Sequence, residues 1–484
     1  MKIVSLVSSL FTLSSITASD ISTYFTLAFF AILLLLIIGF LIGLWRGMWN
    51  SGFRLIFIGI LVVCAFLFTR NIADWLASLD IKAMMSNFGV NLTNISFHMN
   101  STTTITVEIT NIKDMIISAV GQVYEAVGLG SASTTQAIEL ITGLTMIFLR
   151  YITFIIEVLL IIIIGEPLAA FFYHVIFKWL LPRNVRKHMK VRLAGGFMNM
   201  VKVGLVSVMM LIPFSALLNT INQAFQNPDN ATAEGVDSAT YNQIMSFINA
   251  YNDSPFAQVL FNWSVNDEGK TLDVVLMDYL TNENMGDVQL SLSTELYTIA
   301  GIGKTILSTG VADDGMTALT TQLLSNENLV ASLFVDIANS GLIMKAIPIA
   351  LAIAMNMDQV KQYVDPSLLN FDAVDWHEEL LNLGDIADQV VASGVVTDVM
   401  NADQTAMVPT VLNDLANPAK YPSVRQALAD IDNSEFLAQV VPAVLYKLAQ
   451  DDTAPAENLS ISDFLPADWA DYQDLHIGEE LTLF

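Results

Sequence analysis

The sequence predicts an all-α membrane protein with four transmembrane helices and an interfacial amphipathic helix, followed by a mainly helical extracytoplasmic C-terminal domain. Of the 484 residues, 54% are hydrophobic and only 14% are charged, whereas a soluble domain typically has about 25% charged residues. The charge is also divided: residues 1–218 contain 14 Lys and Arg against 9 Asp and Glu, and residues 219–484 contain 7 against 38. The basic half and the acidic half are therefore expected on opposite faces of a membrane.

Charge and cysteine content argue against two classes of function. The acidic balance of residues 219–484 would repel the phosphates of a nucleic acid, so no nucleic acid partner is expected. The chain has one cysteine, Cys64, which lies in an apolar run. It can form no disulfide within the chain and no thiolate metal site, and it is expected to act as a small packing residue.

The first 19 residues have features of a secretory signal segment. Lys2 precedes a short apolar stretch that reaches Leu13, and small residues cluster near Ala18. The alternative is a partly inserted helix before the first true span. A cleaved signal would leave the mature N-terminus on the outer face.

Two apolar runs close together predict the first helical hairpin. Residues 24–45 form an uncharged run of 22 residues, which is long enough to cross about 30 Å of hydrocarbon. A second span is expected at about 53–70, after the tight turn at 46–54. Trp45 and Trp49 flank this turn, as expected of residues in the aromatic belt at a membrane surface.

The outer loop that we expect at 71–140 is polar and contains local structure. Residues 94–100 and 105–109 alternate between apolar and polar side chains, which predicts a small β-hairpin. A helix is expected near 112–127. After a break at 128–133, Ser133 and Gln136 have the spacing of a capping box for the next helix.

Apolar character from 137 to 181 is too long for one span. We place the third span at about 144–164 and expect Gly165-Glu166-Pro167 to end it, since proline suits the first turn of a new helix. From Pro167 to residue 181, Leu168, Phe171, Val175 and Ile176 fall on one helical face. This pattern predicts an amphipathic helix in the cytoplasmic membrane surface, followed by a connector that ends at 192.

The connector and the fourth span complete the membrane domain of residues 20–218. We expect the basic side chains of the connector to contact anionic lipid of the cytoplasmic leaflet, at Lys178, Arg183, Arg186, Lys187, Lys190 and Arg192. The fourth span is expected at about 193–218. Basic residues also lie in the 46–54 turn, so the positive-inside rule places both regions in the cytoplasm and residues 219–484 outside.

The acidic half contains a candidate internal repeat. Residues 335–351 read VDIANSGLIMKAIPIAL and residues 429–445 read ADIDNSEFLAQVVPAVL, so that Asp, Ile, Asn, Ser, Pro and Leu recur 94 residues apart. Ser254-Pro255-Phe256 is a weaker third copy. Repeated helices bury one face against their neighbours. Chance similarity between two acidic amphipathic helices is the alternative.

Short motifs at the two ends of the membrane domain resemble those of the colicin V production protein (CvpA) family. A turn follows the first apolar run, and a basic residue and a glycine open the fourth span; the residues concerned are Gly43, Arg46, Gly47, Arg192 and Gly195. Asn199 stands where the family often has a second glycine. The resemblance covers about residues 20–218 and implies a multi-pass membrane protein linked to toxin production and export.

Three charged residues fall inside predicted spans. Arg150 and Glu157 lie in the third span and Lys202 lies in the fourth. Charges at such depth are costly and often functional. We expect Glu157 and Lys202 to approach each other, because both lie at a similar depth in antiparallel helices. The alternative is that Arg150 and Lys202 extend to the membrane surfaces.

No catalytic residue, cofactor site or metal site is predicted. His377 is followed by two glutamates rather than by a metal-ligand pattern, and the sequence has no Gly-x-Ser-x-Gly element. The leading hypothesis is therefore a non-enzymatic, CvpA-like protein of a bacterial cell membrane. It would act as an envelope scaffold or an accessory factor for toxin production or export, with residues 219–484 binding an envelope or secreted protein.

Two other classes of function stay open. A transporter or channel would use Arg150, Glu157 and Lys202 to line a polar path through the membrane. A hydrolase on the outer face has the least support from the sequence.

Overall fold

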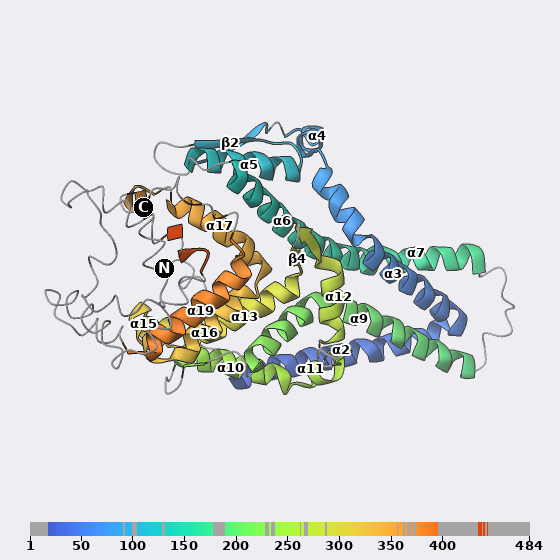
Figure 1. Cartoon of the computed structure of the whole chain (residues 1–484). Helices are drawn as coiled ribbons and strands as arrows, with labels where there is room; N and C mark the ends of the chain where they lie inside the picture. Colours follow the sequence, from blue (N-terminus) through green and yellow to red (C-terminus); the bar gives the residue numbers. More distant parts are fainter. Residues whose placement is uncertain are drawn as a thin grey trace, which may run out of the picture.

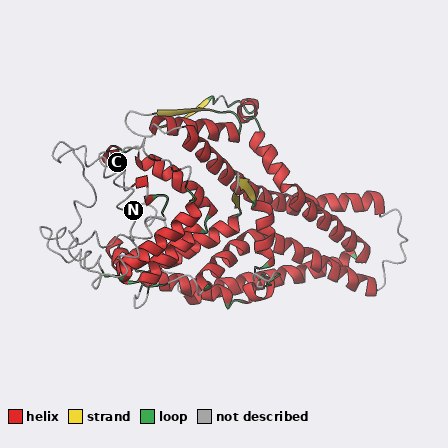
Figure 2. Ribbon diagram, viewed as in Figure 1, coloured by secondary structure: helices red, strands yellow, loops and turns green. Residues whose placement is uncertain are grey.

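The computed structural model of the chain describes residues 18–90, 92–98, 104–127, 131–177, 189–227, 232–233, 238–261, 263–265, 270–285, 288–355, 357–361 and 374–394, together with 364, 369, 371, 434–437, 439–440 and 443. Helices make up most of this part of the chain, and its named strands form two antiparallel pairs (Figure 2).

Four helical segments are long and apolar enough to cross a membrane. They are α2 (Ala18–Arg46), α3 (Met48–Ser78), α6 (Ser131–Leu160) with its continuation, and α9 (Met189–Gln226). Each of the four predicted spans lies within one of these segments. The structure is thus that of an all-α membrane protein.

Lipid is the solvent that suits the outer surface of these helices. Only 17–33% of the most apolar window of each helix is buried inside the protein. Large side chains such as Leu34, Ile60, Phe148 and Val201 remain more than half exposed. In water this surface would be unfavourable, whereas in hydrocarbon it costs nothing, and the helices satisfy their own backbone groups.

The third segment continues through the point where we expected it to end. After α6 come η1 (Ile161–Gly165), α7 (Glu166–Phe172) and η2 (Tyr173–Phe177), and residues 134–176 form one helix. Gly165 has helical angles, φ −61° and ψ −39°. The π-helical turn at 161–165 carries the chain into Pro167 without a break, so the expected break is wrong.

The continuation packs on α3 with the face that carries Ala169 and Tyr173. Ala169 and Tyr173 are buried, and the ring centroids of Tyr173 and Phe53 are 6.0 Å apart. Phe171 and Val175, on the face that we expected to enter the membrane surface, are 60% exposed. The apolar stripe therefore faces away from the protein, and residues 166–177 extend the third span rather than form a separate helix.

The segment between α3 and α6 has the predicted local structure. It contains α4 (Ile81–Asn87), β1 (Asn94–His98), β2 (Thr104–Glu108) and α5 (Ile112–Val127). The two strands pair antiparallel with Ser96 opposite Thr106, which confirms the predicted hairpin. The helix near 112–127 is also confirmed. However, α6 begins at Ser131, so Ser133 lies inside the helix and is not its cap.

The acidic half folds mainly into short helices. They are α10 (Ala239–Asn252), α11 (Pro255–Leu260), α12 (Leu272–Thr281), α13 (Leu292–Ser308), α14 (Val311–Asp314), α15 (Met316–Ser325), α16 (Glu327–Ala338), α17 (Gly341–Met355), α18 (Asp358–Lys361) and α19 (Trp376–Ala392). The short strands β3 (Glu283–Met285) and β4 (Val288–Leu290) form a hairpin before α13. In Figure 1 these elements gather at one end of the four long helices, opposite the α2–α3 turn.

Helix α9 joins the two halves. Its first part packs between α2 and α3, and its last part packs against α12 and α13. Asn219 of α9 donates to the Asp273 carboxylate at 2.9 Å, and the Tyr251 hydroxyl donates to Asn219 Oδ1 at 2.8 Å. Burial, with the charge of Asp273 adding to it, raises the pKa of Tyr251, which keeps its hydroxyl a donor.

The candidate repeat has a structural counterpart at its shared serine. Ser340 and Ser434 are both completely buried. Ser340 Oγ donates to Glu295 at 2.7 Å, and Ser434 Oγ donates to Glu379 at 2.5 Å. Each glutamate is the fourth residue of its helix, α13 or α19.

Each shared serine also accepts a backbone N–H three residues later. Ile343 N donates to Ser340, and Leu437 N donates to Ser434. In the third, weaker copy, Ser254 accepts from Ala257 N in the same way, but its hydroxyl donates to a backbone carbonyl rather than to a glutamate. Most of 429–445 lies outside the described residues, so the repeat stays a prediction for the helices around these serines.

Candidate functional site

Glycines of the family-like motif bring α2 and α9 into close contact. A Cβ atom on Gly43 would lie 2.3 Å from the carbonyl oxygen of Gly195, and one on Gly195 would lie 2.4 Å from the backbone of Gly47. Gly47 also has φ +75°, a conformation that favours glycine. The predicted turn at 46–54 is too long, because α3 begins at Met48 and only Gly47 separates it from α2. Small residues allow helix backbones in membranes to approach closely, so these glycines fix the end of the bundle at Gly47, called here the turn end.

Asn199 does not loosen this contact. It is 1% exposed, and its Nδ2 donates to the backbone carbonyl of Gly39 at 2.6 Å. The side chain faces glycines of α2, which leave room for it. A hydrogen bond to a backbone carbonyl thus joins α9 to α2 at this position.

Three cationic side chains converge on Glu166 just beyond the glycine contact. Arg46 Nη1 and Arg54 Nη1 each lie 2.6 Å from Glu166 Oε1, and Lys202 Nζ lies 2.7 Å from Oε2. The four residues come from α2, α3, α7 and α9. This cluster, called here the Glu166 cluster, ties together all four membrane segments.

The Glu166 cluster is closed on one side and open on the other. Arg54 and Lys202 side chains are 7% and 8% exposed, whereas Arg46 and Glu166 are 29% and 30% exposed. Asn50 accepts a hydrogen bond from Arg54 Nε at 2.8 Å and fixes the guanidinium. A single carboxylate therefore faces three cations, two of which are buried.

A second polar cluster lies at the opposite end of α3 and α6. Arg150 forms an ion pair with Glu283 of β3 and lies 3.8 Å from Asp74. Arg150 Nη1 and Arg70 Nη2 both donate to the carbonyl of Asn282, at 2.8 and 2.5 Å. Asn282 ends α12, and cations favour the carbonyl end of a helix. This cluster, called here the Arg150 clamp, attaches the second half of the chain to the membrane helices.

Glu157 lies between the two clusters and binds neither. Thr69 Oγ1 donates to its Oε2 at 2.5 Å, while its Oε1 is buried without a hydrogen-bond partner in the described part of the chain. The expected pairing of Glu157 with Lys202 is wrong, because Lys202 binds Glu166. The cause is the helix continuing through Pro167, which keeps Glu166 in line with Lys202.

The structure thus divides the three predicted intramembrane charges among three places. Arg150 belongs to the clamp, Lys202 belongs to the Glu166 cluster, and Glu157 binds a threonine. The predicted lipid contacts lie outside this arrangement: Lys190 and Arg192 are exposed near the start of α9. The remaining predicted contacts, Lys178, Arg183, Arg186 and Lys187, lie outside the described residues.

Sequence reasoning missed Glu166 and Arg54 as site residues. Both residues stand out in the sequence: Glu166 is the only acidic residue between Glu157 and residue 181, and Arg54 follows Arg46 by eight residues. The proline after Glu166 indicated a helix end, and this placed the carboxylate at a surface rather than inside the bundle.

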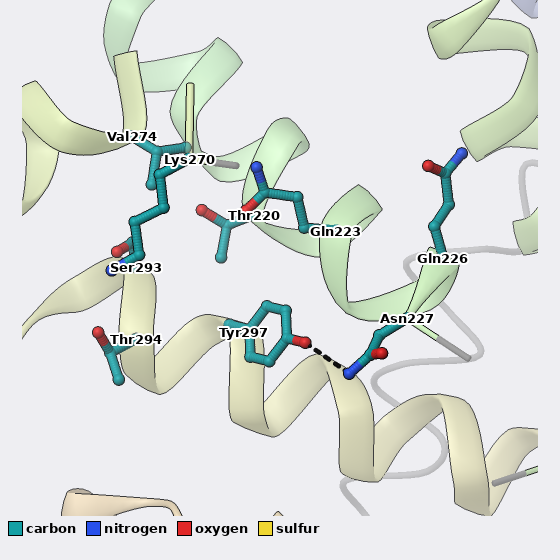
Figure 3. A pocket seen from close by; sticks show the side chains of 9 residues that line it. All are labelled: Thr220, Gln223, Gln226, Asn227, Lys270, Val274, Ser293, Thr294 and Tyr297. Carbon is teal, nitrogen blue, oxygen red and sulfur yellow. Dashed lines mark hydrogen bonds between the residues drawn. The ribbon is translucent and has the colours of Figure 1, made fainter. Parts of the chain in front are cut away.

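A polar cavity of about 440 Å³ lies where α9 meets the second half of the chain. Figure 3 shows side chains from α9 and α13 on its opposite walls, with Asn227 Nδ2 donating to the Tyr297 hydroxyl at 2.8 Å. The cavity is lined by Thr220, Gln223, Gln226, Asn227, Lys270, Val274, Ser293, Thr294 and Tyr297. Amides and hydroxyls dominate, which suits hydrogen bonding to a polar group of a partner.

The described residues include no group of three or more His, Cys, Asp or Glu side chains placed to hold a metal ion. The chain matches no family model, and comparisons with curated proteins and with solved structures find no match either. The resemblance to the CvpA family therefore stays a prediction that rests on the motif residues themselves.

Proposed function

We propose that this protein is a multi-pass membrane scaffold that holds its acidic helical domain on the outer face of a cell membrane and presents it to a protein partner. The observation that carries the proposal is that α9 extends from the membrane helices into the wall of the polar cavity. One helix of 38 residues is both a membrane span and a wall of the polar cavity. A partner bound at the cavity would thus be held at a fixed position relative to the membrane.

The Arg150 clamp supports the same function. It joins the Asn282–Glu283 segment to α6 through the buried Arg150 and to α3 through the half-buried Arg70, so the domain has two attachments to the membrane helices. A rigid attachment suits a scaffold, which positions a partner, better than it suits a carrier whose domains must move apart.

The finer proposal is a CvpA-like role in a bacterial envelope, as an accessory factor for toxin production or export. It is supported by the contact among the motif glycines and by the charge distribution along the chain. The basic turn end would face the cytoplasm, and the acidic half would face an envelope or secreted protein.

One observation favours a transporter or channel instead. Glu157 is enclosed among membrane helices with one carboxylate oxygen unpartnered in the described residues. Enclosed carboxylates of this kind occur in proton relays. Proton or ion flux through the purified protein in liposomes, lost in Glu157→Gln, would replace the scaffold proposal with this one.

Site-specific photocrosslinking in intact cells tests the scaffold proposal. A photoreactive residue at Gln226, which is exposed and lines the cavity, should capture a discrete protein. The matched control is Asn249, which is exposed on α10 but does not line the cavity. The proposal would be overturned if Gln226 and Asn249 captured the same protein equally well, or if neither position captured any protein.

Topology is tested separately by cysteine labelling. Asn249→Cys should react with a membrane-impermeant thiol reagent in intact cells. Ser434 is unsuitable because it is completely buried. Labelling that requires permeabilised cells would place the acidic half inside and contradict the proposal.

A further inference from the structure

The turn end of the bundle has a strong excess of positive charge. Residues 36–62, 158–177 and 189–208 contain five Lys and Arg residues, and Glu166 is their only acidic residue. Within the Glu166 cluster, three cations face one carboxylate, which leaves a formal charge of +2.

Such an excess is costly in a membrane domain. Arg54 and Lys202 are almost fully removed from solvent, and a buried charge is tolerated when an opposite charge and hydrogen bonds compensate it. Glu166 supplies one negative charge to the three side chains. A second anion at the open side of the cluster would restore balance.

The side chains of the cluster are of the type that binds a phosphoryl group. Arg46 is the last residue of α2, and Arg54 is the seventh residue of α3, about 9 Å along that helix from the turn. A bilayer surface at the level of Gly47 would place this depth at the boundary between headgroups and hydrocarbon. Guanidinium groups bind phosphate oxygens through paired, charge-assisted hydrogen bonds, and a lysine adds a point charge.

We propose that Arg46, Arg54 and Lys202 form a phosphoryl-binding site beside Glu166, and that its occupant is the headgroup of an anionic lipid. The site lies inside the bundle and uses residues other than those of the basic connector. It goes beyond the scaffold function and does not depend on it, since a transporter would need the same compensation.

Lipid binding to the purified full-length protein tests this site. The protein is placed in neutral phosphatidylcholine, and binding of phosphatidylglycerol is measured by native mass spectrometry and by the rise in Tm that a ligand of the folded state produces. A second arm adds inorganic phosphate alone. Stabilisation by phosphatidylglycerol but not by phosphate identifies the lipid headgroup; stabilisation by phosphate alone contradicts the lipid assignment.

Two variants that should change phosphatidylglycerol binding in opposite directions make the test specific. Arg46→Gln should weaken phosphatidylglycerol binding about fivefold, the effect of one basic residue near a membrane surface. Glu166→Gln should strengthen binding severalfold, because it removes the competing carboxylate. Lys361→Gln, which removes an exposed charge on α18 in the second half of the chain, should leave binding nearly unchanged.

Two outcomes would overturn the site. If Lys361→Gln weakens binding as much as Arg46→Gln does, the lipid is attracted by the general charge of the protein. If Glu166→Gln weakens binding, the carboxylate organises the site and does not compete with an anion. Arg46 is partly exposed, so its variant keeps the test decisive even if Glu166→Gln does not fold.

Discussion

Lys202 of α9 and Glu166 of α7 form an ion pair across the membrane domain, with 2.7 Å between Nζ and Oε2. The pair is one of three that Glu166 makes, because Arg46 and Arg54 share its other oxygen. The carboxylate thus connects helices that are distant in sequence, at the end of the bundle where the backbones of α2 and α9 are in closest contact.

Because Glu166 has three cationic partners in this cluster, removing Glu166 should reduce stability more than removing one of the cations. Glu166→Gln leaves three cations without their partner and should lower the free energy of unfolding by about 3–5 kcal/mol. Lys202→Met should cost less, because two arginines still compensate Glu166. Thermal unfolding in neutral detergent, with the double variant completing a cycle, measures the coupling. Purely additive effects would mean that the two residues do not interact.

The glycine contact predicts a second difference. Gly195→Ala places a methyl group within 2.4 Å of the Gly47 backbone and should destabilise the protein by about 1–3 kcal/mol, because backbone cannot yield as a flexible side chain can. Gly59→Ala is the matched control on a neighbouring helix, since no atom lies within 4 Å of its added carbon. Equal stability of the two variants would contradict the close approach of α2 and α9.

The Arg150 clamp predicts a local loss of protection. Arg150→Gln removes a buried cation from Glu283 and the Asn282 carbonyl, and should raise hydrogen exchange in the β3–β4 hairpin by tenfold or more. Lys82→Gln is the control, because its ion pair with Glu108 is largely exposed, and exposed ion pairs contribute little to stability. Unchanged exchange in Arg150→Gln would show that the clamp does not hold the hairpin.

The two buried serines predict equal roles if the repeat is real. Ser340→Ala and Ser434→Ala each remove a hydrogen bond to a buried glutamate and should each cost about 1–3 kcal/mol. Ser86→Ala, at an exposed helix end, should cost far less. Chemical denaturation measures all three. If either substitution left the free energy of unfolding unchanged, the similarity of the two segments would be due to chance.

Local sequence patterns predicted much of this fold. The four spans follow from long apolar runs with at most two charged residues each, which have few alternatives to a helix in lipid. Alternation at 94–109 predicted the hairpin β1–β2 correctly. The motif residues Gly43, Gly47 and Gly195 were also singled out, although their mutual contact could not be seen from spacing.

Other features depended on neighbours that the sequence does not identify. Pro167 indicated a helix end, but a π-helical turn absorbs it and the span continues. The sequence assigned Phe171 and Val175 to a membrane surface. In the structure, the opposite face of the same helix, with Ala169 and Tyr173, packs on α3. In lipid, apolar side chains gain nothing by facing the protein, so hydrophobic periodicity does not reveal which face is packed.

By itself, the sequence determined that the chain has four segments apolar enough to cross a membrane, a basic half and an acidic half. Only the tertiary structure decided which charges meet: Lys202 binds Glu166 rather than Glu157, and Arg150 reaches across to Glu283. The physical reason is that hydrophobicity is a property of each segment, whereas an ion pair depends on the rotation and the register of two helices against each other. Those are set by close contacts such as the one between Gly43 and Gly195.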